Sequence, residues 1–196
     1  MKAFSGRQSS YIDGGPQWAI PQAVVDGWLA DGSFAAGASA FRAAMRHHAK
    51  GVAIITTGME TPVGFCATSL ASITLQPPIL AFTVGLQSSS WPAVESASYV
   101  MVHLLADDQA DLAHRFGQTG ALRFGPGTRW HRDAFGLPVL DGVLACMVVA
   151  PTSHLPVGDH ALVIGRVIAT RHGRVRGPLV HVGGQFVPLA VPPDPA

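Results

Sequence analysis

Short runs of apolar residues alternate with short polar segments from residue 52 to residue 189. The apolar runs are rich in β-branched residues and bounded by glycine or proline, which favours strands over helices. Strands are predicted at 52–57, 79–84, 99–105, 143–149 and 161–170, and a closing hairpin at 179–182 and 186–189. The pattern therefore predicts a mainly β domain, and closure of its sheet into a barrel would protect the edge strands.

Apolar residues with helical spacing precede the first predicted strand. One short helix is predicted around 24–30. A second is predicted to begin with Ser39 as its N-cap and to stop at Gly51. His47 and His48 would then lie in its last turn, where partial positive charge complements the helix dipole.

Two further short helices are predicted between the strands. One ends near Glu95, and the other covers 107–117, with acidic residues at its start, basic residues at its end and Gly117 as the C′ residue. The following segment, 117–138, carries glycine, proline and scattered basic residues. It is predicted to be a long loop with little regular structure.

The composition divides the chain into three parts. Residues 1–37 are rich in small residues and proline and are predicted to be an N-terminal extension. Residues 38–190 carry the strand pattern and form the predicted domain. Residues 191–196 are a proline-rich tail.

Charge and hydrophobicity limit the kinds of partner. Charged residues make up only 13% of the chain and hydrophobic residues 48%, so an isolated monomer would expose apolar surface that a second subunit can cover. A homodimer is therefore expected. The net charge of +1, without a basic run, predicts neither a nucleic-acid partner nor an anionic membrane partner.

Other sequence signals concern the cellular compartment. The longest apolar runs are far shorter than the roughly 20 residues of a membrane span, and the N-terminus lacks the apolar core of a signal peptide. A cytoplasmic protein is expected. Cys66 and Cys146 are the only cysteines and have no metal-ligand spacing, so neither a disulfide framework nor a metal site is predicted.

The stretch 63–84 offers the clearest candidate chemistry. Small and hydroxyl residues stand there between two apolar runs, namely Ala67, Thr68, Ser69, Ala71 and Ser72. A flat ligand could approach the backbone closely at such residues, which suits a planar heteroaromatic cofactor. The alternative is an ordinary strand, bend and strand with surface hydroxyls, in which Cys66 is a small buried hydrophobe.

A second candidate is the run of serines that precedes the predicted helix near Glu95. Ser88, Ser89 and Ser90 provide hydroxyls, and the helix N-terminus adds free N–H groups that can hold a phosphate. Simple N-capping of the helix is the alternative.

The order of residues in these stretches resembles a known family. Residues 64–78, Gly-Phe-Cys-Ala-Thr-Ser-Leu-Ala-Ser-Ile-Thr-Leu-Gln-Pro-Pro, are similar to the flavin-binding segment of the short-chain flavin reductases. These are NAD(P)H:flavin oxidoreductases with an FMN-binding split β-barrel of Greek-key type and a few flanking helices. Four further similar stretches follow in the same order as in the family: 88–91, 99–117, 158–160 and 178–181 leading to Phe186. The resemblance extends over roughly 41–189.

The resemblance implies a set of site residues. His160, the candidate catalytic residue, would position the nicotinamide rather than transfer a proton, the alternative being a turn with His160 at a strand start. Arg123 would contact the flavin phosphate or adenylate, the alternative being a solvated loop charge. The remaining implied cofactor-binding residues are Cys66, Ala67, Thr68, Ser69, Leu70, Ala71, Ser72, Ser88, Ser89, Ser90, Trp91, Phe116, Gly158, Asp159, His181, Val182, Gly183 and Gly184.

The function implied is hydride transfer from NADH or NADPH to FMN or FAD, with the reduced flavin supplied to a separate monooxygenase. Two alternatives stay open: a split-barrel flavoenzyme that keeps its flavin and acts on a small molecule, and a redox-inert flavin-binding subunit. Some positions depart from the family pattern. Leu86 stands where relatives carry Lys or Arg, His103 where Asn is frequent, and Val182 and Gly183 where an aromatic residue and Arg are common. Because Leu86 would remove a cation from the phosphate, readily exchanging flavin is predicted.

Overall fold

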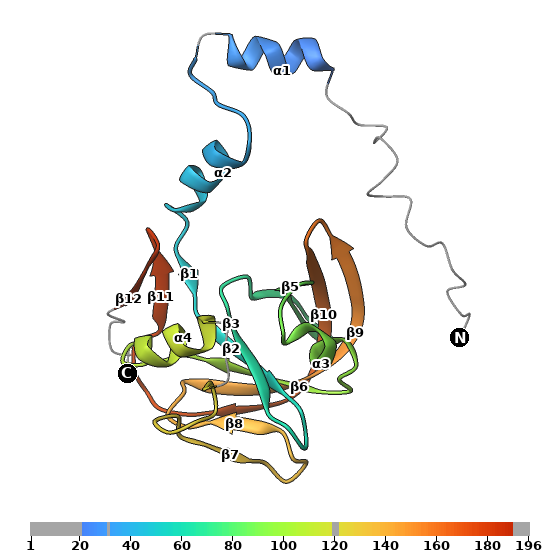
Figure 1. Ribbon diagram of the computed structural model, residues 1–196, viewed down its shortest axis with the longest axis vertical. Helices are drawn as coiled ribbons and strands as arrows, with labels where there is room; N and C mark the ends of the chain where they lie inside the picture. Colours follow the sequence, from blue (N-terminus) through green and yellow to red (C-terminus); the bar gives the residue numbers. More distant parts are fainter. Residues whose placement is uncertain (1–20, 31, 119–121, 190–196) are drawn as a thin grey trace, which may run out of the picture. The chain divides into compact units, whose positions relative to one another are not determined.

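The computed structural model describes residues 21–30, 32–118 and 122–189 (Figure 1). The chain divides into two compact units, one ending at Met45 and the other beginning at Arg46. The first unit contains α1 (Gln22–Leu29) and α2 (Ala38–Met45). The predicted helix around 24–30 is confirmed by α1.

The second predicted helix is shorter than expected. It begins at Ala38, so Ser39 lies within it and is not its N-cap. It ends at Met45, so Gly51 does not terminate it, and His47 and His48 lie in the turn that follows. Lys50 and Gly51 form β1 (Lys50–Gly51), which pairs antiparallel with β11 (Leu179–Val182). The pairing with a distant strand determines the local structure here, and sequence spacing cannot show it.

The second unit is built on one seven-stranded antiparallel sheet. Its spatial order is β3-β2-β6-β9-β10-β5-β4, so the two edge strands, β3 and β4, follow one another in the sequence. The strands are β2 (Ala53–Thr57), β3 (Val63–Ala67), β4 (Ala71–Leu75), β5 (Pro78–Gly85), β6 (Val100–Leu104), β9 (Ala145–Val157) and β10 (His160–His172).

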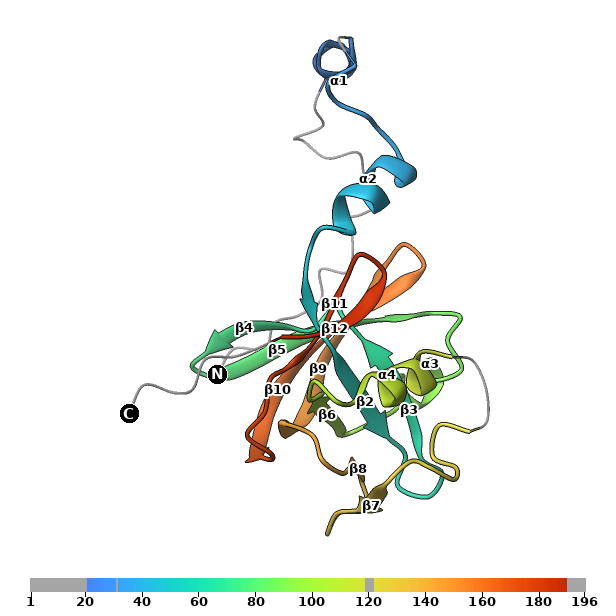
Figure 2. The same cartoon turned by 90° about the vertical axis from the view of Figure 1, so that its left-hand side faces the viewer.

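The sheet curls so that its first strand in space, β3, meets its sixth, β5. Phe65 of β3 and Phe82 of β5 pack inside, with ring centroids 6.2 Å apart. One hydrophobic cluster fills this interior, and Val94 of α3 (Trp91–Glu95) belongs to it. The β4–β5 hairpin extends to one side of the barrel (Figure 2). The predicted mainly β architecture is confirmed.

A second hydrophobic cluster covers the outer face of β2 and β6. It joins Ile54 and Leu105 to side chains from the flanking elements, such as Phe116, Leu140 and Leu179. Those elements are α4 (Ala110–Gly117), β7 (Trp130–Arg132), β8 (Pro138–Leu140) and a small sheet of β1, β11 and β12 (Gln185–Pro188) (Figure 1). Because both faces of β2 are covered, all of its residues are buried.

The segment predicted as a long loop contains regular structure. β7 and β8 form an antiparallel hairpin in which Trp130 pairs with Leu140. Arg132 fastens this hairpin to the β2–β3 turn by donating to the carbonyl oxygens of Gly58 at 3.0 Å and Glu60 at 2.6 Å. Gly117 is the last residue of α4 rather than a C′ residue outside it. No helix in the described part of the chain is long and apolar enough to cross a membrane.

Candidate functional site

A cavity of about 440 Å³ lies where the ends of β3 and β5 meet α4 and the start of β10. Its wall joins segments that are far apart in the sequence. The lining residues are Phe65, Cys66, Ala67, Thr68, Ser69, Thr83, Val84, Gly85, Gln87, Ser88, Ser89, Phe116, Gly117, Arg123 and His160. A cavity of this size suits a small-molecule ligand or cofactor.

One wall is the bend that follows β3. The Ser69 hydroxyl accepts a hydrogen bond from the Thr83 N–H at 2.9 Å, which holds the bend against the end of β5. The Thr68 hydroxyl has no hydrogen-bond partner among the described residues. The small side chain of Ala67 leaves the backbone close to the cavity. The bend therefore presents a backbone surface and a hydroxyl to a flat ligand.

A second wall comes from the serines before α3. Ser88 and Ser89 line the cavity, and the Ser88 hydroxyl accepts from the Ser90 N–H at 3.2 Å. Ser90 is fully buried and donates to the Gly64 carbonyl oxygen at 3.3 Å. Trp91 packs edge-on against His154, with ring centroids 5.8 Å apart. Of the four residues predicted here, Ser88 and Ser89 face the cavity, while Ser90 and Trp91 do not line it.

Arg123 places a cation between these two walls. Its Nη1 donates to the Gly64 carbonyl oxygen at 2.5 Å and to Ser90 Oγ at 3.0 Å, and its Nη2 donates to the Gln118 carbonyl oxygen at 2.6 Å. Partial burial lowers the pKa of the guanidinium, but Arg stays charged at any ordinary pH. Among the described residues, no carboxylate pairs with it. Its charge is therefore available to an anion in the cavity.

Glycine at position 64 allows α4 to pack closely on β3 beside the cavity. A Cβ atom at position 64 would come within 2.9 Å of Phe116 Cε1 and 3.0 Å of the Ile55 carbonyl oxygen. Phe116 lines the cavity and belongs to the outer cluster. Only glycine allows α4 to pack this closely on β3.

His160 lines the cavity from the first position of β10, where it pairs with Gly85 of β5. Its Nδ1 lies 2.7 Å from the Asp159 carboxylate, which leaves Nε2 free for a ligand. The bond to His160 lowers the pKa of Asp159. Gly158 has a φ of 59° and forms the turn between β9 and β10. Gly158 and Asp159 thus orient His160 without lining the cavity themselves.

The flavin reductase like domain matches residues 45–190 of the chain. The chain belongs to this family. It is 42% identical over 128 residues to an NADH:FMN oxidoreductase of Rhodococcus qingshengii, covering 65% of this chain and 67% of that protein. It is 34% identical over 168 residues to HsaB, the reductase subunit of a flavin-dependent monooxygenase in Rhodococcus jostii, covering 84% and 85%.

Solved structures agree with the sequence comparisons. A flavin reductase domain protein from Arthrobacter sp. has a TM-score of 0.73 at 36% identity, covering 80% of this chain and 97% of that one. The NADH:FAD oxidoreductase of Streptomyces globisporus, solved with NAD and FAD fragments, has a TM-score of 0.73 at 25% identity, covering 80% and 93%. The predicted family and its split-barrel fold are confirmed.

The cavity fits the flavin that the family implies. A flat wall of small residues can face an isoalloxazine ring, and hydroxyls with one unpaired cation can receive a phosphate. The predicted residues gathered around it are Cys66, Ala67, Thr68, Ser69, Ser88, Ser89, Phe116, Arg123 and His160. No cluster of three or more His, Cys, Asp or Glu residues within the described ranges is arranged to hold a metal ion.

Other predicted residues lie outside the cavity. Leu70 packs against the barrel interior, and Ala71 and Ser72 lie on the exposed strand β4. The β11–β12 hairpin carries His181, Val182, Gly183 and Gly184, none of which lines the cavity. This hairpin is held elsewhere, because β11 pairs with β1 and Phe186 of β12 packs edge-on against His114 of α4.

Some lining residues were not among those predicted from the sequence. These are Phe65, Thr83, Val84, Gly85, Gln87 and Gly117. Thr83, Val84 and Gly85 lie at the end of β5, and their contribution to the cavity depends on register, since Gly85 pairs with His160. For Gln87, its position directly before the predicted Ser88 was a sequence signal that could have identified it as a lining residue.

Leu86 does not occupy the place expected for a missing phosphate ligand. Its side chain packs against the barrel interior and does not line the cavity, and its N–H donates to the Asp159 carbonyl oxygen at 2.9 Å. The expectation that Leu86 faces the phosphate is therefore wrong. The neighbouring Gln87 is exposed and lines the cavity.

Proposed function

We propose that the protein transfers hydride from NADH or NADPH to FMN or FAD and releases reduced flavin to a separate flavin-dependent monooxygenase. The supporting observation is the cavity that joins the 66–69 bend, Ser88, Ser89, Arg123 and His160. The relatives support the same activity, since one is an NADH:FMN oxidoreductase and another the reductase subunit of a monooxygenase.

A bound flavin would supply the hydride chemistry, so the protein needs to bind and orient rather than to provide a nucleophile. In this proposal the bend after β3 supports the ring, while Arg123 and the serines hold the phosphate. His160, fixed by Asp159, uses Nε2 to position the nicotinamide. Cys66 stays protonated, because burial raises the pKa of its thiol to about 11. Its role is to contribute a small apolar wall.

We also propose a homodimer in the cytoplasm. Apolar side chains are exposed on β4, β9 and β10, where a monomer would leave them in water; they are Ile73, Leu75, Leu155, Val157 and Ile168. The cysteines Cys66 and Cys146 are both free, which fits a reducing compartment.

Anaerobic mixing of the protein with NADH and a several-fold excess of FMN tests the activity. We expect the absorbance of the whole flavin pool to bleach with turnover. Bleaching that is limited to one equivalent of bound flavin, followed by substrate-dependent reoxidation, would favour an enzyme that keeps its flavin. Absence of bleaching with both NADH and NADPH would favour a redox-inert flavin-binding subunit.

His160→Ala tests the nicotinamide side of the cavity. We expect KM for NADH to rise roughly tenfold or more, as for the loss of a contact of about 1.4 kcal/mol, with little change in FMN affinity. Steady-state kinetics together with flavin fluorescence titration measures both quantities. An equal loss of FMN affinity would place His160 in the flavin site instead.

A further inference from the structure

A second cavity, of about 350 Å³, lies on the outer face of the sheet. It is formed where the end of β10 passes β8 and the start of β9, and it shares no lining residue with the flavin cavity. Its volume is within the range of small-molecule sites. The lining residues are His131, Leu140, Asp141, Gly142, Val143, Cys146, Arg171, Gly173 and Arg174.

The floor of this cavity is apolar and fixed in place. Leu140, Val143 and Cys146 are buried members of the outer hydrophobic cluster. The Leu140 N–H donates to Nε2 of the buried His103 at 3.1 Å, which ties the floor to β6. An apolar ligand body would meet a surface that needs no rearrangement, and this lowers the cost of binding.

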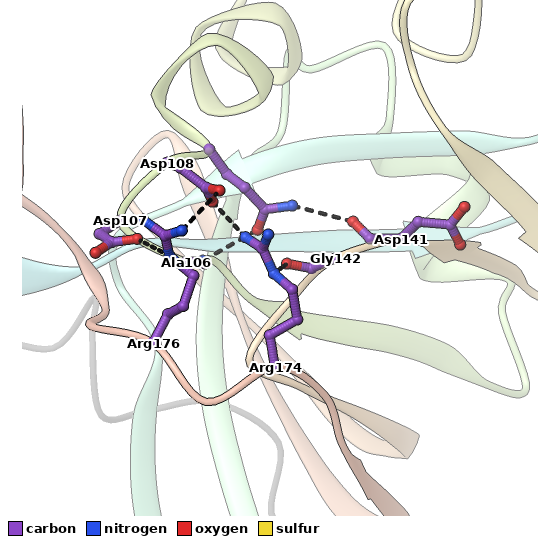
Figure 3. A network of polar contacts seen from close by, with 8 residues as sticks. Ala106, Asp107, Asp108, Asp141, Gly142, Arg174 and Arg176 are labelled. Atoms are coloured by element: carbon purple, nitrogen blue, oxygen red, sulfur yellow. Dashed lines mark hydrogen bonds and ion pairs between the residues drawn. The ribbon is translucent and has the colours of Figure 1, made fainter. Parts of the chain in front are cut away.

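A framework of ion pairs holds the rim (Figure 3). Arg174 donates to the Gly142 carbonyl oxygen at 2.9 Å and forms an ion pair with Asp108, and Arg176 pairs with Asp107 at 2.7 Å. On the other side of the rim, Asp141 pairs with His131 at 2.9 Å. The carboxylate of Asp141 and the guanidinium of Arg174 therefore each have a protein partner of opposite charge when His131 is protonated.

Arg171 differs from these residues. It is exposed near the end of β10, and in the described part of the chain its guanidinium has neither a hydrogen bond nor an ion pair. Its charge is one of those that lower the pKa of His103, which lies beneath the floor. An unpartnered cation thus stands at the charged rim of a cavity whose floor is apolar.

We propose that this cavity binds a small organic monocarboxylate, with its carboxylate on Arg171 and its apolar body against Leu140, Val143 and Cys146. Guanidinium and carboxylate match in shape as well as in charge. The inference does not depend on flavin reduction, because the two cavities are separate and binding here is measured without turnover.

Isothermal titration calorimetry of the full chain with benzoate tests the proposal. We expect benzoate to bind, and benzamide, its uncharged counterpart, to bind at least about tenfold more weakly. Arg171→Gln should weaken benzoate about tenfold or more, which is the effect of losing a charge-assisted hydrogen bond. The matched control is Arg166→Gln, because Arg166 is exposed on the same strand and lines neither cavity. It should bind benzoate like the unaltered chain.

Several results would overturn the proposal. They are no benzoate binding at millimolar concentration, equal binding by the chain with Arg171→Gln, or an equal loss with Arg166→Gln. Inorganic phosphate provides a further arm: if it binds at this cavity as tightly as benzoate, the apolar floor contributes nothing and the assigned ligand class is wrong. Thermal unfolding of both variants checks that the fold is retained.

Discussion

His103 shows how burial fixes one charge state. The ring is fully buried, its Nδ1 lies 3.1 Å from the Ile54 carbonyl oxygen, and its Nε2 accepts from the Leu140 N–H. Only the neutral tautomer with hydrogen on Nδ1 satisfies both partners. Burial is the largest cause that lowers the pKa of His103 to about 4 from its ordinary value of 6.5. This residue therefore has a structural role between β2, β6 and β8.

The His103 pKa predicts a loss of stability in acid. Between pH 6.5 and 4 the unfolded chain binds a proton at this residue that the folded chain does not, so the free energy of unfolding falls as the pH falls through this window. The shift is equivalent to about 3 kcal/mol. Urea unfolding at several pH values should show this slope, and His103→Asn should reduce it. His172→Asn, at an exposed position, is the control and should leave the slope unchanged.

In the proposed site, Arg123 is the cation that would distinguish a phosphate from a neutral ligand. We predict that Arg123→Gln weakens FMN binding about tenfold or more and changes riboflavin, which has no phosphate, by much less. Fluorescence titration with both flavins measures this difference. Arg115→Gln serves as the control, because Arg115 holds the Pro126 carbonyl oxygen and lies outside the cavity. Equal losses for FMN and riboflavin would show that Arg123 only supports the fold.

At the scale of elements, the turn between β5 and α3 separates a packing position from a binding position. Leu86 packs against the barrel interior, whereas the adjacent Gln87 is exposed on the cavity wall. The Ser88 N–H donates to the Gly85 carbonyl oxygen at 2.9 Å, so Leu86 and Gln87 are the two central residues of a β-turn, one serving the core and the next facing the cavity.

The different surroundings of Leu86 and Gln87 predict different results for the same substitution at the two positions. Leu86→Arg should lower the free energy of unfolding by roughly 1 to 3 kcal/mol, since it exchanges apolar packing for a partly buried charge. Gln87→Arg should leave stability within about 0.5 kcal/mol and should tighten FMN but not riboflavin. Thermal unfolding and paired flavin titrations measure these effects. Tighter FMN binding by Leu86→Arg would contradict the assignment.

At the scale of the whole molecule, the exposed apolar side chains on β4, β9 and β10 support the proposed second subunit. Ile73 is 55% exposed and Leu75 is 81% exposed, both on an edge strand that is exposed along its whole length. Apolar side chains on such an edge favour association over a stable monomer.

We predict that Leu75→Glu shifts the protein from dimer to monomer. Burying a carboxylate at the interface without a partner costs several kcal/mol, which is enough to weaken a micromolar dimer severely. Sedimentation velocity across a range of concentrations measures the change. Val175→Glu is the control, because Val175 is fully exposed on the loop that follows β10 and does not belong to the strands that carry the exposed apolar side chains. A monomer in the unaltered protein would contradict the proposal directly.

The sequence by itself determined the class of the fold and the kinds of residue in the site. Runs of β-branched residues bounded by glycine and proline predicted five of the seven strands of the sheet, namely β2, β5, β6, β9 and β10, because their period is local. The ordered motifs at 64–78, 88–91 and 158–160 predicted the family and much of the flavin cavity.

Only the tertiary structure decided which residues meet. The curling of the sheet brings β3 to β5, and the pairing of Gly85 with His160 completes the cavity wall. Long-range pairing also ended α2 before Gly51, and packing directed Leu86 into the core. The second cavity follows from the same cause. Arg171 and Leu140 are distant in the chain, and no local pattern records that a cation at the end of one strand will stand over the apolar floor of another.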